Sequence, residues 1–208
     1  MNEWKRTALD NIVYKNPVLT HALGICTIVA AGTTLYNGFI LSLLFAAVCI
    51  PTCIISSLFY RKLMRPYRSA AVVLTASVFY TLGVWGLTWV YGSISTLFRY
   101  YLPLMAVNSL MFNRAVRYAP RETVRETILD SATSAVGFGV AACLTGALRE
   151  LLQNGAIAGW QIFHFKGELH MTQVPFFGFI ALGFIAAAAR AVRLRRDRRA
   201  RRERSTER

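Results

Sequence analysis

Two apolar runs of this chain contain polar and thiol-bearing side chains that could form a site. The run LTHALGICTIVAAGTTLY includes Cys26 among glycines and threonines, and the run LFRYYLPLMAVNSLMFN includes Pro103, Asn108 and Ser109. Such residues indicate that each run is an interrupted helix. In a membrane, broken helices are tolerated only where their backbone is buried in protein or lines a cavity. The two runs therefore predict a site near the middle of a bilayer.

The other three cysteines have a simpler interpretation. Cys49 and Cys53 are four residues apart in CIPTC, so they share one helix face and could clamp a metal. They have no histidine or acidic neighbours at that depth, and we expect them to pack as small apolar side chains. Cys143 lies in AACLTG, among small residues that suit close helix contact. A disulfide framework is not expected, because all four cysteines fall in apolar stretches.

Two adjacent charged residues, Arg149 and Glu150, end another apolar run in GALREL. Such a pair at a membrane boundary is often interfacial, with the arginine extended toward the lipid headgroups. The alternative is a role in ion passage or in contact between subunits. The sequence leaves both interpretations open.

The elements that hold these residues are predicted to be membrane-spanning helices. The residues are 55% hydrophobic and only 16% charged, which is too apolar for an ordinary soluble domain. We expect a single all-α membrane domain over residues 1–208. Its apolar stretches long enough to span a membrane number about six: 19–36, 38–59, 69–91, 97–113, 127–148 and 172–194.

The two interrupted helices are the first and the fourth of these spans. Aligning Cys26 with Ser109 sets Ile25 against Asn108, and each interrupted span opens a group of three. An odd number of spans per group would give the two groups opposite orientations in the membrane. These features agree with an inverted three-plus-three repeat with two half-helices, and we predict that repeat mainly from the family resemblance described below.

Positive charge is concentrated on one predicted side of the membrane. Lysines and arginines precede the first span, follow the second span in residues 61–68, and follow the fourth between Arg114 and Arg125. The positive-inside rule then places both termini in the cytoplasm. Residues 195–208 form a basic tail. We interpret it as an anchor on the anionic headgroups of the lipid bilayer and not as a nucleic-acid site.

The sequence contains no motif for a soluble cofactor or for catalysis by the chain alone. It has no glycine-rich nucleotide loop after a strand, no CxxC pair, and no serine–histidine–aspartate arrangement that fits one pocket. We therefore expect the chain to act as part of a larger complex and not to turn over a substrate by itself.

Four stretches resemble one known family of membrane proteins. They are KNPVLTHALGIC (15–26), VNSLMFNRAVRYA (107–119), LDSATSAVGFGVAACLTGALREL (129–151) and NGAIAG (154–159). The chain is similar to the paired six-helix subunits of the Rnf electron-transport complex and of the related sodium-translocating NADH:quinone reductase. The similarity is to the branch that holds the E-type subunits of Rnf and the D-type subunits of the reductase.

The resemblance implies a membrane subunit of an ion-translocating ferredoxin:NAD oxidoreductase in the bacterial cytoplasmic (inner) membrane. In that family two homologous subunits of opposite orientation share one [2Fe–2S] cluster, to which each contributes two cysteines. The cluster passes electrons across the bilayer, and the complex couples this to ion transport. The implied partners are a homologous A-type membrane subunit and the other Rnf subunits, which would hold the flavin and nucleotide sites.

The chain departs from the family at the cluster ligands. The positions that match the family's cysteines are Cys26 and Ser109, the latter beside Asn108. The family usually reads Asn-Cys at the second position, and a serine oxygen is a poorer iron ligand than a thiolate. Three outcomes stay open. The cluster is held by three thiolates plus Ser109 or another ligand, it is shifted to a different cysteine of this chain, or it is absent. In the last case the chain is a scaffold or a transporter-like membrane protein.

Overall fold

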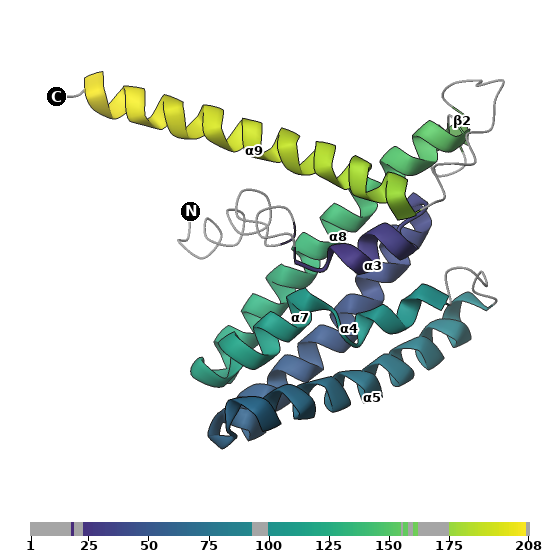
Figure 1. Ribbon diagram of the computed structural model, residues 1–208, viewed down its shortest axis with the longest axis vertical. Helices are drawn as coiled ribbons and strands as arrows, with labels where there is room; N and C mark the ends of the chain where they lie inside the picture. The colour runs from purple at the N-terminus through teal and green to yellow at the C-terminus, as the bar shows by residue number, and fades with distance from the viewer. Residues whose placement is uncertain are drawn as a thin grey trace.

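The computed structural model of the chain consists almost entirely of helices (Figure 1). It describes Val18 and residues 23–92, 100–154, 156–157, 160–161 and 175–206. Its α-helices are α3 (Ile25–Ala31), α4 (Leu35–Phe59), α5 (Arg65–Tyr91), α7 (Ser109–Asn113), α8 (Val124–Asn154) and α9 (Pro175–Thr206). Residues 19–22, 97–99 and 172–174 of the predicted spans, and residues 207–208 of the predicted tail, lie outside the described residues.

The remaining elements are short. The 3-10 helices are η2 (Tyr60–Lys62), η3 (Leu102–Met105) and η5 (Ala119–Arg121). A π-helical turn, η4 (Arg114–Tyr118), continues α7. Two strands of two residues each, β1 (Ala156–Ile157) and β2 (Trp160–Gln161), pair antiparallel after α8.

Three of the described helical segments are long and apolar enough to cross a membrane: Leu35–Lys62, Pro66–Val90 and Val124–Gln153. The apolar part of α9, Phe176–Val192, is shorter. Large side chains on these helices are exposed, among them Trp85, Trp89 and Phe184, as expected of surfaces that face lipid. The chain is thus an all-α, multi-pass membrane protein, as its composition predicts.

The long helices fall on the second, third and fifth predicted spans, and each begins a few residues before the predicted start. The first and fourth predicted spans contain short pieces of helix, as their glycine, proline and polar residues predict. The exact count of six spans therefore stays a prediction.

The core lies along the contact between α4 and α8, which cross at close range (Figure 1). Phe45 and Phe138 stack with their ring centroids 4.2 Å apart. A methyl group at Gly38 would lie only 2.7 Å from the carbonyl oxygen of Ala142. Small residues at such a crossing let two backbones approach closely, which is how helices gain packing contacts in a membrane.

The short helical segments of each half of the chain contact long helices of the other half. Helix α3 opens the first half and contacts α8 and α9 of the second half. The π-helical turn η4, which continues α7 in the second half, contacts α4 and α5 of the first half. The inverted three-plus-three repeat itself stays a prediction.

Helix α9 contacts α3 and α8, and then extends away from the other helices (Figure 1). The residues predicted as a basic tail continue this helix as far as Thr206. The tail is therefore an extension of the last apolar helix and not a separate element.

Candidate functional site

The first half-helix begins at a glycine that no other residue could replace without strain. Gly24 precedes α3 and has φ 77°, a left-handed conformation that glycine adopts readily and L-residues avoid. The space around it is also closed. A methyl group at this position would lie 3.0 Å from Oδ1 of Asn108 and 3.3 Å from the ring of Phe138. The chain therefore turns into α3 in direct contact with the second half-helix.

The second half-helix begins at Asn108, whose side chain caps it. Oδ1 of Asn108 accepts hydrogen bonds from the backbone N–H groups of Leu110 (2.9 Å) and Met111 (3.5 Å), as is typical of a capping asparagine. Its Nδ2 donates to Oγ1 of Thr27 on α3 (2.9 Å). Asn108 is fully buried, so both ends of its amide are used. One side chain thus fixes the start of α7 and ties it to α3.

A second polar contact joins the two half-helices. The hydroxyl of Ser109 accepts a hydrogen bond from the backbone N–H of Gly24 (2.8 Å). Oγ1 of Thr27 donates to the carbonyl oxygen of Gly24 (2.9 Å). Together with the Asn108–Thr27 bond, these contacts link the amino-terminal ends of α3 and α7. The structure therefore brings the two predicted runs together at their polar residues.

Cys26 and Ser109 lie on the open side of this junction. Both are exposed, whereas Thr27 and Asn108 beneath them are buried. Each belongs to the first turn of its short helix. A group bound by the thiol of Cys26 would therefore be accessible to a neighbouring molecule as well.

Arg149 and Glu150 lie at the carboxyl-terminal end of α3, away from the junction. Nη1 of Arg149 donates to the carbonyl oxygens of Val29 (2.7 Å) and Gly32 (3.4 Å). Oε2 of Glu150 accepts from the backbone N–H of Leu35 (2.9 Å). Arg149 is 0% exposed, so its guanidinium is not extended toward the lipid headgroups, while the position of the pair at the membrane boundary stays a prediction. The guanidinium is directed inward because unpaired helix carbonyls are available there.

An ion pair that the sequence analysis did not predict lies near the other end of α8. Nη1 of Arg114 and Oδ1 of Asp130 are 2.8 Å apart, and both side chains are mostly shielded. The Arg114 guanidinium also lies 5.6 Å from the centre of the Tyr118 ring. The sequence held one signal for this pair: a single acidic residue lies in an apolar run, and an arginine lies just after the preceding run. The pair ties the π-helical end of the second half-helix to α8.

Comparison with known proteins identifies the family. The family model of the Rnf-Nqr subunit, a membrane protein, matches residues 4–187. The chain belongs to the Rnf-Nqr subunit family.

Three relatives of this family illustrate the similarity. Each is named as the E-type subunit of an ion-translocating oxidoreductase complex. The protein of Shewanella amazonensis is 25% identical over 207 residues, which cover 92% of this chain and 89% of the relative. That of Shewanella piezotolerans is 27% identical, with 90% and 87% covered. That of Sodalis glossinidius is 28% identical, with 89% and 86% covered.

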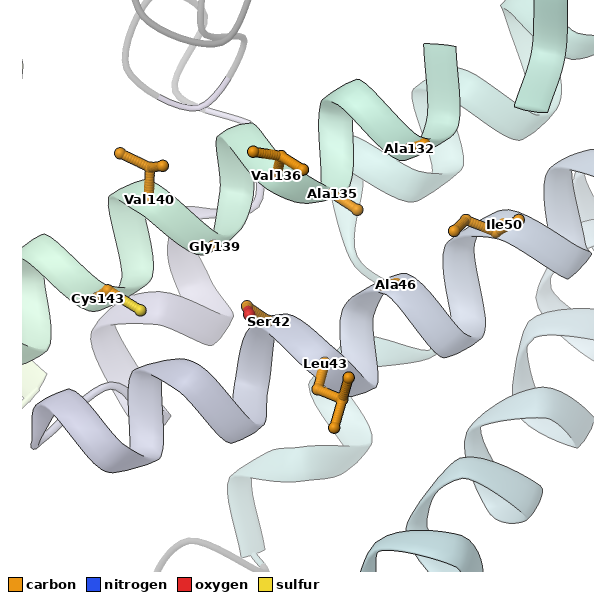
Figure 2. Close-up of a pocket in the computed structure, with 10 residues that line it drawn as sticks. All are labelled: Ser42, Leu43, Ala46, Ile50, Ala132, Ala135, Val136, Gly139, Val140 and Cys143. Atoms are coloured by element: carbon orange, nitrogen blue, oxygen red, sulfur yellow. The ribbon is translucent and has the colours of Figure 1, made fainter. Parts of the chain in front are cut away.

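The other cysteines of this Rnf-Nqr protein lie away from the junction. Cys49 and Cys53 are buried inside the bundle with their sulfur atoms 3.9 Å apart. Cys143 lines an apolar groove of about 500 Å³ between α4 and α8, which Gly139 also lines (Figure 2). Among the residues that the structure describes, no group of three or more histidine, cysteine or acidic side chains could hold a metal ion.

The exposed donor atoms at the junction are too few to hold an iron–sulfur cluster without a second chain. A [2Fe–2S] centre needs four ligands, usually thiolates. The described part of this chain offers one exposed thiol, Cys26, and one exposed oxygen, Ser109, at neighbouring helix ends. The remaining ligands of such a cluster would have to come from a partner.

Proposed function

We propose that this chain is the E-type membrane component of an Rnf-type ion-translocating ferredoxin:NAD oxidoreductase. Its place is the bacterial cytoplasmic membrane, with both termini in the cytoplasm. It relays electrons across the bilayer through a [2Fe–2S] cluster shared with a homologous A-type partner, and the complex couples this transfer to ion transport. The names of the relatives and the family support the assignment to the complex.

One observation of the structure carries the redox part of the proposal. The two positions that match the family's cysteines, Cys26 and Ser109, are both exposed on the first turns of half-helices that contact each other. Cys26 lies two residues after Gly24, whose N–H donates to the Ser109 hydroxyl. The chain's own contribution is thus an accessible thiol on a short helix whose start is fixed by a second short helix.

The residues of the junction have separate roles in this proposal. Cys26 is the thiolate ligand that this chain supplies. Ser109 is the candidate oxygen ligand, and it also holds the backbone of Gly24. Asn108 orients both half-helices from beneath. When bound, the cluster would supply one-electron transfer.

The second candidate function is a cluster-free scaffold or transporter-like protein. A specific observation favours it: the hydroxyl of Ser109 already accepts a hydrogen bond from the backbone. A serine in that role maintains the junction without iron. Position 109 would then have a structural function only, and the exposed Cys26 would meet the partner without a metal.

Iron and acid-labile sulfide analysis separates the two candidates. The chain is purified with its membrane partner, and a low-temperature EPR spectrum is recorded after dithionite reduction. The proposal predicts about two irons per pair of subunits and a reduced [2Fe–2S] signal. The signal is lost in Cys26→Ala and retained in Cys143→Ala, since Cys143 lies in the groove between α4 and α8. An intact wild-type complex without iron would support the scaffold or transporter function.

A further inference from the structure

The turn between α3 and α4 brings two helix ends of opposite polarity within a few residues of each other. Helix α3 ends at Ala31 with Gly32 as its cap, and α4 begins at Leu35 after Thr34. The last carbonyls of a helix carry partial negative charge and lack partners in the helix, while the first N–H groups carry partial positive charge. Both ends therefore need external partners if they are buried.

Arg149 binds the carboxyl-terminal end of α3. Its guanidinium donates to the carbonyl oxygens of Val29 and Gly32, which belong to the last turn and the cap of α3. The side chain is fully buried, so its charge is poorly solvated and these acceptors help to stabilise it. Hydrogen bonds from a charged donor are about twice as strong as neutral ones.

Glu150 binds the amino-terminal end of α4. Its carboxylate accepts from the N–H of Leu35, the first residue of α4. The hydroxyl of Thr34 accepts from the N–H of Asn37 and completes the cap. Adjacent residues of α8 thus place a cation at the carbonyl end of one helix and an anion at the amide end of the next. The reverse order would place each charge beside a helix end of its own sign.

Two glycines allow α8 and α9 to pack closely around this pair. A methyl group at Gly146, less than one turn before Arg149 on α8, would collide with the carbonyl oxygen of Thr34. A methyl group at Gly178 on α9 would lie 2.9 Å from Nη1 of Arg149 and 3.0 Å from the carbonyl oxygen of Val29. Helices α8 and α9 can therefore approach the turn only because side chains are absent at these two positions.

We propose that Arg149 and Glu150 are positioning residues that clamp the α3–α4 turn and thereby hold Cys26 beside Ser109. Helix α3 has seven residues, or about 10 Å, and a helix this short is not stable without external contacts. It is held at its start by the junction and at its end by the clamp. The clamp is a property of the fold, whereas its effect on a cluster rests on the proposed function.

Hydrogen exchange in the complex tests the clamp directly. Arg149→Gln and Glu150→Gln each remove a charge but keep a polar side chain of similar size. We expect amide exchange in residues 25–37 to become about tenfold faster or more, because bonds to charged groups are lost. In Glu150→Gln the largest change should be at Leu35. Arg149→Lys, which keeps the charge, should show a smaller increase.

The matched charged control is Arg114→Gln. Arg114 pairs with Asp130 near the other end of α8, so its loss should affect exchange at residues 109–121 and leave 25–37 unchanged. Unchanged exchange at 25–37 in the Arg149 and Glu150 variants would overturn the proposal. An equal increase in every helix would overturn it as well, because the pair would then support the whole bundle and not this turn.

A second pair of variants covers the case in which the charge variants do not fold. Gly178→Ala adds a methyl group against Arg149 without removing any charge, and Gly183→Ala adds one on the same helix where nothing lies within 4 Å. The clamp predicts faster exchange at residues 25–37 in Gly178→Ala alone. Equal behaviour of the two variants would contradict it.

The EPR spectrum separates this proposal from the proposed function. If the wild-type complex contains the cluster, the g-values of the Arg149→Gln cluster should shift or spread, and Arg149→Lys should restore them in part. Local loosening at 25–37 in a complex without iron would leave the clamp standing and remove the redox function. A cluster with unchanged exchange and g-values in both variants would remove the clamp and leave the redox function.

Discussion

The two short helices of this Rnf-Nqr protein meet at the same place but begin in different ways. Helix α3 starts after Gly24 in a left-handed conformation with no side-chain cap, whereas α7 starts after Asn108, whose side chain caps it. The exposed group on α3 is a thiol, and the one on α7 is a hydroxyl that accepts a bond from Gly24. The second half-helix thus holds the first in place, and the first carries the exposed thiol.

The carboxyl-terminal ends of the two half-helices also differ in the contacts that hold them. The end of α3 is fixed by the fully buried Arg149 and by the adjacent Glu150, which holds the start of α4. The end of α7 continues into a π-helical turn, where Arg114 pairs with the partly shielded Asp130. Arg149 is fully buried, whereas the side chains of Arg114 and Asp130 are 23% and 13% exposed, and removing a partner costs more where the charge is more deeply buried. We therefore expect the half-helix that bears Cys26 to be the more tightly positioned of the two.

Among the variants that test this comparison, Asn108→Ala should lower the stability of the protein most. Asn108 is buried and bonded to both half-helices, so its loss leaves Thr27 and the first N–H groups of α7 short of partners. We expect a cost of about 2–4 kcal/mol in the free energy of unfolding. The measurement is the apparent melting temperature in detergent. The control is Ser77→Ala, whose hydroxyl bonds within α5, and a similar melting temperature for both variants would contradict the role of Asn108.

Gly24→Ala tests the other partner of the junction. Both Gly24 and Gly92 have positive φ, but a methyl group at Gly24 would meet Asn108 and Phe138, while at Gly92 it would meet nothing within 4 Å. The conformational strain alone costs about 1–2 kcal/mol. We expect Gly24→Ala to lower the melting temperature further than Gly92→Ala. Equal shifts would mean that the contact with Asn108 is not restrictive.

Some of these features follow from the sequence and others do not. Glycine, proline and polar residues in apolar runs predicted both interrupted helices, and the composition predicted the long apolar ones. The direction of the Arg149 side chain was not predictable, because it depends on which carbonyls the α3–α4 turn leaves free near α8. The Arg114–Asp130 pair was also missed, since residues sixteen apart on different helices are brought together only by packing.

Ser109→Ala should have a smaller effect on stability. It removes one hydrogen bond, to the N–H of Gly24, at a position that is exposed. We expect a loss of about 1 kcal/mol, or a fall of a few degrees in the melting temperature. A loss as large as that of Asn108→Ala would show that the two residues contribute equally, contrary to the comparison.

The smallest effect is expected from Asp130→Asn at the outer end of α7. Asparagine keeps an oxygen that can accept the hydrogen bond from Arg114, so the variant loses only the charge of a mostly shielded pair, and we expect a cost of about 1 kcal/mol or less. The variant should melt close to wild type and keep the iron content of the complex unchanged. Loss of iron in this variant would show that the position of α7 matters as much as that of α3, contrary to the comparison.

The proposed redox function requires that Cys26 binds the cluster and that Ser109 occupies the position of a second ligand. The decisive experiment is to record EPR spectra of the reduced complex with Ser109→Cys and to compare them with those of wild type and Cys26→Ala. We expect a [2Fe–2S] signal in wild type, an equal or larger signal with altered g-values in Ser109→Cys, and none in Cys26→Ala. A signal that persists in Cys26→Ala, or iron absent from both wild type and Ser109→Cys, would contradict it.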